Sequence, residues 1–477
     1  MITIIVGRAA QFILALAMLR VATTLLSPEE MGKVSLALTT IAFFAMFLVN
    51  PVGMFINRRL HAWQTNGLAR AYLERYAGYL IGVALLAAIS LPLFNLSGLV
   101  NFGMPIGWIA ALVCASLIFN TINQTSIPSL NMLGDTLRFV ALSVATLAAS
   151  FVCAVTLVET VQTSAQYWVL GLLLGQMLLA VVGTRMLFAK LNLHGVPTAS
   201  PGIRGRHLHV LFDFAWPVAL AAGLGWVQSQ GYRYIMESHL GMAQLGLFVA
   251  GYGISAGMIA GFESILTTYF QPRLYRDANK DHPAEQAQAW RRYAAAVIPS
   301  LILTVALIVL LAPEFTRIFL GERFQGAASL VVWGALAEAA RVLTGVYSLI
   351  AHVYMRTRWL ILPTAVGAAL SILLCVLLIP PLGALGAGIA LALAGFVVVA
   401  LLHILLAHRA GGGVPLYTLC QAALATVALC AAALGMRALS NTADWAVIIS
   451  VIVITGLVYL GLLYRLLRQH LVEMREA

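Results

Sequence analysis

The chain is divided, almost from end to end, into apolar runs that are each about 20 residues long. A run of that length crosses about 30 Å of membrane hydrocarbon as an α-helix, which satisfies its backbone hydrogen bonds internally. The sequence therefore predicts an all-α, polytopic membrane protein with fourteen transmembrane helices. These runs lie at residues 3–26, 34–56, 77–96, 104–125, 139–158, 166–189, 210–231, 245–269, 293–312, 326–350, 359–379, 384–407, 416–436 and 445–466.

Composition excludes the soluble classes of protein. Hydrophobic residues make up 61% of the chain and charged residues 9%, and the mean hydropathy is +0.94. A soluble domain has about 25% charged residues, so an ordinary soluble enzyme and a disordered chain are both excluded. The net charge of +11 would indicate nucleic acid in a soluble protein. In a membrane protein it is explained by basic cytoplasmic loops, and we expect no nucleic-acid partner.

The basic residues predict the orientation of the spans. With the N-terminus in the cytoplasm, twenty of the 28 Lys and Arg residues fall in inside segments and five fall outside. Three lie within spans, and an even number of spans places both termini in the cytoplasm. No loop is long enough to bury its own core, and the spans contain no metal cluster or nucleophile–base pair. We therefore expect a transporter with no cofactor or metal, and not an enzyme.

The spans suggest two lobes of six helices followed by an extra pair. A gapless alignment places EEMG on AQLG and NRRL on QPRL, at residues 29–32, 243–246, 57–60 and 271–274. A parallel repeat of this kind places the substrate path between the lobes. The predicted parts are a first lobe, a cytoplasmic linker, a second lobe and a final hairpin with its tail, at residues 1–190, 191–209, 210–409 and 410–477.

Basic residues inside the first span are candidates for substrate binding. A charge at the bilayer centre costs about 2.5–3.5 kcal/mol, so charges found there usually face a cavity or each other. Arg8 and Arg20 are twelve residues apart, about 18 Å along a helix. They either extend to the headgroups or form a basic wall that meets an anionic substrate. Arg58 and Arg59 would continue that wall at the cytoplasmic end of the second span.

Other polar residues inside spans allow two interpretations each. Glu338 and Arg341 are three residues apart and can pair on one helix face, or they can serve a cavity. Glu263 has no charged neighbour on its own helix. It either bonds a neighbouring helix or takes up a proton during a transport cycle. Asn50 and Gln228 either join helices or hydrogen-bond a hydroxyl-rich ligand.

Two further features concern the shape of the spans. Proline within a span kinks the helix and frees a carbonyl, which predicts kinks at Pro51, Pro217, Pro299 and Pro363. The segment 58–76 mixes four arginines with three aromatic residues. It is either an amphipathic helix on the cytoplasmic membrane surface or a solvated loop.

Several motifs resemble one family of transporters. LSPEEMG (26–32) is similar to the short turn after the first span of Wzx-type oligosaccharide flippases, which belong to the multidrug/oligosaccharidyl-lipid/polysaccharide exporter superfamily. The resemblance continues in Gly53 and Arg58, and in residues 214–236, 245–255, 320–324 and 379–392. One departure is that family members often carry Asp-Arg at the outer end of the seventh span, where this chain has Gly231-Tyr232-Arg233.

The resemblance implies flipping of an undecaprenyl-pyrophosphate-linked oligosaccharide between the leaflets of a bacterial inner membrane, by alternating access. Membrane lipids and polysaccharide assembly proteins would be its partners. The substrate contacts would be Arg8, Arg20, Arg58, Arg59, Arg341, Asn50 and Gln228, while Glu263 and Glu338 would couple transport to a proton or sodium ion. The main alternative is a cation-coupled multidrug antiporter. A membrane-embedded glycosyltransferase or polymer ligase would need a larger outer loop.

Overall fold

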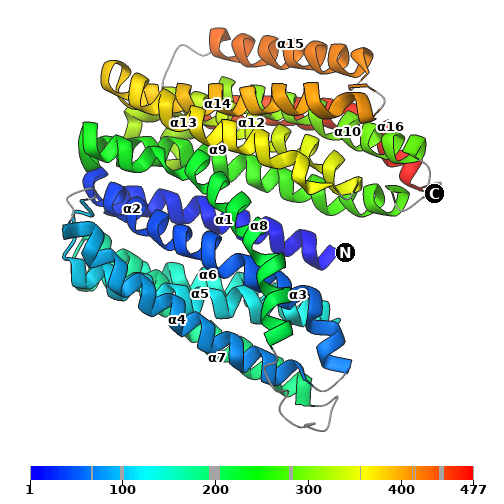
Figure 1. Ribbon diagram of the computed structural model, residues 1–477. Helices are drawn as coiled ribbons and strands as arrows, with labels where there is room; N and C mark the ends of the chain where they lie inside the picture. Colours follow the sequence, from blue (N-terminus) through cyan, green and yellow to red (C-terminus); the bar gives the residue numbers. More distant parts are fainter. Residues whose placement is uncertain are drawn as a thin grey trace. The chain divides into compact units, whose positions relative to one another are not determined.

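A computed structural model describes residues 2–65, 68–96, 101–192, 205–278, 283–354, 356–410, 412–413, 415–439 and 445–475. Every regular element in these ranges is a helix, and the chain forms two compact units (Figure 1). We call residues 1–247 unit 1 and residues 248–477 unit 2. Most of the predicted linker, residues 191–209, lies outside the described residues, and the division into six-helix lobes stays a prediction.

Unit 1 contains eight α-helices, one π-turn and the beginning of a ninth helix. Their bounds are α1 (Ile2–Leu25), α2 (Pro28–Phe44), η1 (Ala45–Val49), α3 (Asn50–Thr65), α4 (Ala69–Leu96), α5 (Ile106–Met132), α6 (Thr136–Thr160), α7 (Ala165–Asn192), α8 (Gly205–Gln230) and α9 (Tyr232–Ala278). Within the unit, α5 packs against α4 and α7, α6 packs against α1 and α7, and α8 packs against α3.

Unit 2 contains the rest of α9 and the C-terminal helices. Their bounds are α10 (Pro283–Leu310), α11 (Ala312–Phe319), η2 (Glu322–Ala327), α12 (Ala328–Val353), η3 (Thr357–Leu360), α13 (Ile361–Leu382), α14 (Ala384–Leu406), η4 (Ala407–Ala410), α15 (Leu416–Leu439) and α16 (Trp445–Arg475). The core lies between α10, α12 and α14, where Trp290 donates a hydrogen bond from Nε1 to the carbonyl of Val346 at 2.9 Å.

The predicted spans correspond to the helices. Thirteen helical runs of the described chain are long and apolar enough to cross a membrane. One of them, His209–Asp277, has 69 residues, about 100 Å of helix, and contains both the seventh and the eighth predicted spans. A turn at Gly231 and a left-handed residue at Gly241 (φ 78°) interrupt it. Counting its two spans separately gives the fourteen that the sequence predicts.

The LSPEEMG motif forms the first turn of α2. Ser27 caps the helix by accepting a hydrogen bond from the backbone N–H of Glu30, and Pro28 occupies the first position, where its missing N–H costs nothing. The carboxylate of Glu30 pairs with Lys33 at 2.8 Å and accepts from the backbone N–H of Ala165 at 2.6 Å. Ala165 begins α7, so one acidic side chain ties the start of α2 to a second helix N-terminus, a favourable place for negative charge.

Two segments contact each other in unit 1, and they are the same two segments that the repeat alignment places on one another. A Cβ atom at Gly32 would overlap the carbonyl oxygen of Met242, and a Cβ atom at Gly246 would overlap that of Pro28. The alignment pairs Gly32 with Gly246 and therefore also Pro28 with Met242. The glycine of each segment therefore meets the residue four positions before the glycine of the other segment. A contact in which two equivalent surfaces meet in this reciprocal way is typical of two-fold symmetry. We call these four residues the glycine contact.

A π-turn separates α2 from α3 but does not end the helix. Pro51 has no N–H to donate to the preceding turn, and the backbone widens over η1 (Ala45–Val49). The hydroxyl of Tyr79 donates to the carbonyl of Leu48 at 2.8 Å, so a carbonyl at this turn is satisfied from α4. The helical rod then continues to Thr65. Segment 58–76 is therefore not one surface helix but the end of α3 and the start of α4, packed together through Trp63 and Tyr72.

The extra C-terminal pair packs on unit 2. Both α15 and α16 contact α10, and the hydroxyls of Thr304 and Tyr459 are 2.9 Å apart. Arg437 of α15 binds Glu314, with Nη2 to Oε2 at 2.6 Å, and donates to the carbonyl of Leu310. Glu314 belongs to α11, a short helix between the ninth and tenth predicted spans. Its side chain is 12% exposed, so the ion pair is largely shielded from solvent.

Candidate functional site

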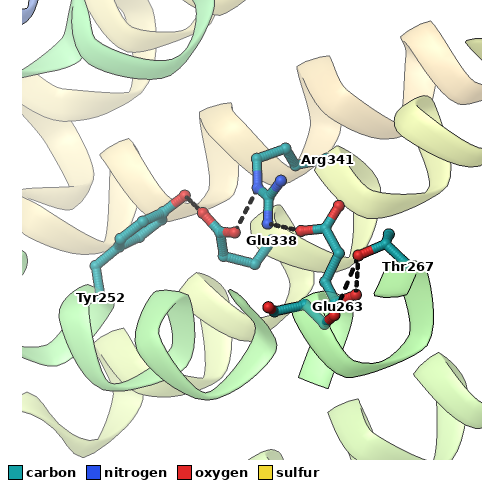
Figure 2. Close-up of polar contacts among 6 residues, drawn as sticks. Tyr252, Glu263, Thr267, Glu338 and Arg341 are labelled. Atoms are coloured by element: carbon teal, nitrogen blue, oxygen red, sulfur yellow. Dashed lines mark hydrogen bonds and ion pairs between the residues drawn. The ribbon is translucent and has the colours of Figure 1, made fainter. Parts of the chain in front are cut away.

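The strongest cluster of charged groups within the spans lies in unit 2, between α9 and α12. Arg341 donates from Nε to Oε2 of Glu338 at 2.6 Å, and from Nη2 to Oε2 of Glu263 at 2.8 Å. Tyr252 donates its hydroxyl proton to Oε1 of Glu338 at 2.5 Å. Figure 2 shows the guanidinium between the two carboxylates, with Tyr252 on the far side of Glu338. We call Glu263, Glu338 and Arg341 the charge triad.

The charge triad contains contacts that the sequence analysis allowed for both of its carboxylates. Glu338 and Arg341 do pair along one face of α12. Glu263 bonds a neighbouring helix, as one of its two interpretations predicted. Its partner Arg341 lies 78 positions further along the chain, a pairing that spacing within one helix cannot indicate. Two carboxylates and one guanidinium carry a formal charge of −1 when ionised. Arg341 is therefore neutralised where it stands, and the triad as a whole attracts cations rather than anions.

The two arginines of α1 lie in different surroundings. Arg8 is exposed and donates to the side-chain oxygen of Gln11 at 3.3 Å. Arg20 is half-buried, and its backbone carbonyl accepts hydrogen bonds from Thr23 and Thr24. Twelve residues of α-helix turn by about 120° beyond three full turns. The two side chains therefore leave α1 in different directions, and a continuous basic wall stays a prediction.

The uncharged candidates and Arg58 are also in unit 1. Asn50 follows the π-turn and is exposed, and Gln228 lies half-buried in the last turn of α8. Arg58 belongs to α3, and its side chain lies outside the described part of the structure. Nothing places these three residues in one site with the charge triad.

Arg59 lies at the edge of a cavity of about 390 Å³. Its guanidinium carbon is 5.6 Å from the centre of the Phe55 ring, a cation–π distance. The cavity opens between α3, α4 and the start of α8, and we call it the α3–α4 cavity. It is lined by Val52, Phe55, Ile56, Arg59, Trp63, Tyr72, Arg75, Tyr76, Tyr79, Val210 and Leu211. The sequence singled out Arg59 and three aromatic residues of segment 58–76, but it could not show that they line one cavity with Phe55 and Tyr79.

The motif that departs from the family pattern makes a polar link between helices. Arg233 donates from Nη1 to the hydroxyl of Thr39 at 2.5 Å and from Nε to the hydroxyl of Tyr232 at 3.1 Å. The indole of Trp226 donates to the carbonyl of Thr39 at 3.2 Å. Arg233 therefore joins α9 to α2 without an acidic neighbour at position 232.

Comparisons with known proteins agree with this architecture. A family model described as "Polysaccharide biosynthesis protein" matches residues 21–329, whereas no curated protein sequence matches the chain. A solved structure of "Lipid II flippase MurJ, inward closed conformation" is similar at a TM-score of 0.64 and 14% identity, over 98% of this chain and 99% of that chain. These findings confirm the predicted polytopic all-α fold and the resemblance to the exporter superfamily.

Two further solved structures are of multidrug resistance MATE family transporters of the MOP superfamily. An inward-facing conformation has a TM-score of 0.63 and 16% identity, over 84% of this chain and 94% of that chain. An outward-facing conformation has a TM-score of 0.56 and 14% identity, over 86% and 94%. At these identities the likeness concerns the fold, so the substrate has to be argued from the chain itself.

Proposed function

We propose that this chain, which belongs to the polysaccharide biosynthesis protein family through a match over more than half its length, moves a lipid-linked oligosaccharide across a bacterial inner membrane. In this proposal the protein flips an undecaprenyl-pyrophosphate-linked repeat from the cytoplasmic to the periplasmic leaflet by alternating access, with both termini in the cytoplasm. The family match is the observation that carries the proposal. It favours a substrate in polysaccharide assembly over a small cationic drug.

The distribution of charge in unit 1 supports an anionic substrate. Among the residues that the structure describes, Arg8 and Arg59 form no ion pair with a carboxylate. Arginine binds phosphate through several N–H donors in a fixed planar arrangement. Arg8, Arg20, Arg58 and Arg59 therefore remain our candidates for pyrophosphate contacts, with Asn50 and Gln228 as hydrogen-bonding partners of the sugars. Arg341 is a weaker candidate than the sequence suggested, because two carboxylates neutralise it.

The charge triad of unit 2 supports coupling to a cation. A cluster with a surplus carboxylate, 29% exposed at Glu263, can exchange a proton or sodium ion with water and change its charge in doing so. We propose Glu263 and Glu338 as the coupling groups. In Glu263→Gln, transport should no longer respond to the proton or sodium gradient, and an unaltered response would remove Glu263 from this role.

The direct test is deletion of the gene in its host, with mass spectrometry of polyprenyl-linked lipids and staining of surface polysaccharide. The flippase proposal predicts that the lipid-linked oligosaccharide accumulates while surface polymer is lost, and that the intact gene restores both. The mass of the accumulated lipid would begin to identify the repeat. Unchanged lipids and normal surface polymer would contradict the proposal.

A cation-coupled multidrug antiporter is the second candidate, because the charge triad is negative and the fold is similar to MATE transporters. The same deletion strain separates the two functions. New sensitivity to cationic drugs with normal polyprenyl-linked lipids would favour the antiporter, and the charge triad would then be examined as its cation site.

A further inference from the structure

We infer that the α3–α4 cavity binds the phosphate-bearing headgroup of a polyprenyl-linked lipid, with Arg59 contacting the phosphate and the aromatic wall contacting the first sugar. The inference rests on the proposed function and assigns one of its steps, the capture of the headgroup before translocation. It concerns a cavity of unit 1, whereas the charge triad belongs to unit 2.

The position of the cavity along the membrane span suits an amphiphile. The apolar run that the sequence predicts as the second span ends at residue 56, and the lining of the cavity continues on both sides of that residue. Val52 lies one turn inside the span, whereas Arg59 and Trp63 lie about one and two turns beyond it. The wall therefore changes from apolar to basic where lipid tails give way to headgroups. A lipid with a charged head and an apolar tail has the same order of apolar and charged groups along its length.

Charge within the surrounding segment favours an anion. Residues 57–76 contain one acidic residue, Glu74, and its carboxylate pairs with Arg70 at 2.9 Å on the exposed surface. No carboxylate among the described residues pairs with Arg59. A second arginine, Arg75, also lines the cavity. A phosphate placed between these two guanidinium groups would receive charge-assisted hydrogen bonds, which are the stronger class.

Aromatic rings hold the arginines and form the wall. The guanidinium of Arg59 lies over Phe55 and that of Arg75 over Tyr72, each at 5.6 Å from the ring centre. The rings of Trp63 and Tyr72 are stacked, 4.2 Å apart and within 16° of parallel. Such contacts reduce the side-chain freedom that binding would otherwise remove. Flat aromatic faces also suit the apolar C–H faces of a sugar ring.

The size of the cavity limits what it can hold. A volume of about 390 Å³ is at the lower end of the range for small-molecule sites, which is about 300–1,000 Å³. It suits a pyrophosphate with the sugar next to it, and it is too small for a whole oligosaccharide. The cavity would therefore recognise the pyrophosphate and the sugar attached to it, and leave the remaining sugars outside.

The test measures lipid retained by the purified full-length protein in native mass spectrometry, with undecaprenyl pyrophosphate and phosphatidylglycerol as separate probes. Arg59→Gln should lower retention of undecaprenyl pyrophosphate by about tenfold, the effect expected for one hydrogen bond to a charged group. Arg59→Lys should restore part of it. The matched control is Arg70→Gln, which removes a guanidinium from the same segment. Arg70 is paired with Glu74 and does not line the cavity.

The outcomes separate this inference from the proposed function. If the wild-type protein retains undecaprenyl pyrophosphate and Arg59→Gln retains it equally well, the inference is wrong while the proposed function stands. If the wild-type protein retains none, the proposed function itself is contradicted, and the inference with it. Equal retention of phosphatidylglycerol, with the same dependence on Arg59, would make the cavity a general lipid site and overturn its assignment to the substrate. Thermal unfolding of each variant checks that the protein is folded.

Discussion

The two ends of the α2–α3 rod are built in opposite ways. Near its start, Gly32 meets the backbone of Met242 so closely that no methyl group would fit. Near its end, Arg59 borders a cavity of about 390 Å³. The two residues are 27 positions apart, about 40 Å along the helix. Unit 1 is therefore closed at the glycine contact and accessible at the α3–α4 cavity.

One helical rod can therefore close a transporter at one end and bind a ligand at the other. Backbone can touch backbone only where side chains are absent, so closure of one end depends on glycine. Long charged and aromatic side chains at the other end leave space among themselves and offer groups that bind a ligand. If transport proceeds by alternating access, the glycine contact is the part of unit 1 that has to separate for a substrate to leave at that end.

The largest effect is expected from filling the glycine contact. In Gly32→Val or Gly246→Val, three added carbons would meet backbone atoms that cannot move aside. We expect a cost of about 3 kcal/mol, the upper end of the usual range for overpacking. This cost lowers the population of the closed arrangement about 100-fold and abolishes the proposed surface-polysaccharide export. Labelling measures the opening, in a protein whose native cysteines have been replaced and which carries Met31→Cys at this buried position. With Gly32→Val or Gly246→Val added, the new cysteine should react with a membrane-impermeant maleimide at least tenfold faster than with both glycines intact.

Gly82→Val is the matched control, because a Cβ atom at Gly82 of α4 would meet nothing within 4 Å. It should leave both export and labelling near the wild-type level. Normal export in the Gly32 and Gly246 variants would show that the close contact has no part in the transport cycle.

An intermediate effect, on stability, is expected from replacing Arg341 of the charge triad, and a smaller one from replacing Arg59 at the α3–α4 cavity. Arg341→Gln leaves two carboxylates without their cation and should lower stability by about 1–3 kcal/mol. We expect less than for a fully buried pair, because the Arg341 side chain is 44% exposed. Arg59→Gln breaks no ion pair and should change stability by less than about 0.5 kcal/mol. Thermal unfolding of the purified variants measures both.

The double variant Arg341→Gln/Glu338→Gln serves as the control for charge, because it returns the triad to −1. It should recover part of the lost stability. Equal unfolding temperatures for Arg341→Gln and Arg59→Gln would show that the two arginines are held in equivalent ways, contrary to the structure.

The smallest effect is expected at the π-turn between the two ends. Tyr79→Phe removes the hydroxyl that donates to the carbonyl of Leu48, at an expected cost of about 0.5–1.5 kcal/mol. Tyr464→Phe, at a position that is 60% exposed, is the control. A loss of stability in Tyr79→Phe alone would support the role of α4 in holding the turn, and equal stability of both variants would argue against it.

The sequence was sufficient for the spans and insufficient for the contacts between them. Apolar runs of about 20 residues located every described helical run that is long and apolar enough to cross a membrane, because the bilayer imposes that length. They did not predict that α3 continues to Thr65, since packing of Trp63 on Tyr72 is a contact between helices. For the same reason they did not identify Arg341 of α12 as the partner of Glu263. The alignment of EEMG with AQLG identified Gly32 and Gly246 as equivalent, but gave no sign that they touch.

The ion pair between Arg437 and Glu314 has a mechanical consequence for the last two helices. Together with the bond to the carbonyl of Leu310 and the contact of Tyr459 with Thr304, it fixes α15 and α16 to the outside of α10. If unit 2 rotates during transport, these two helices rotate with it and displace the surrounding lipid. The viscous resistance of the bilayer then acts on α15 and α16 as well as on the rest of unit 2. The rate of the transport cycle should therefore depend on membrane viscosity.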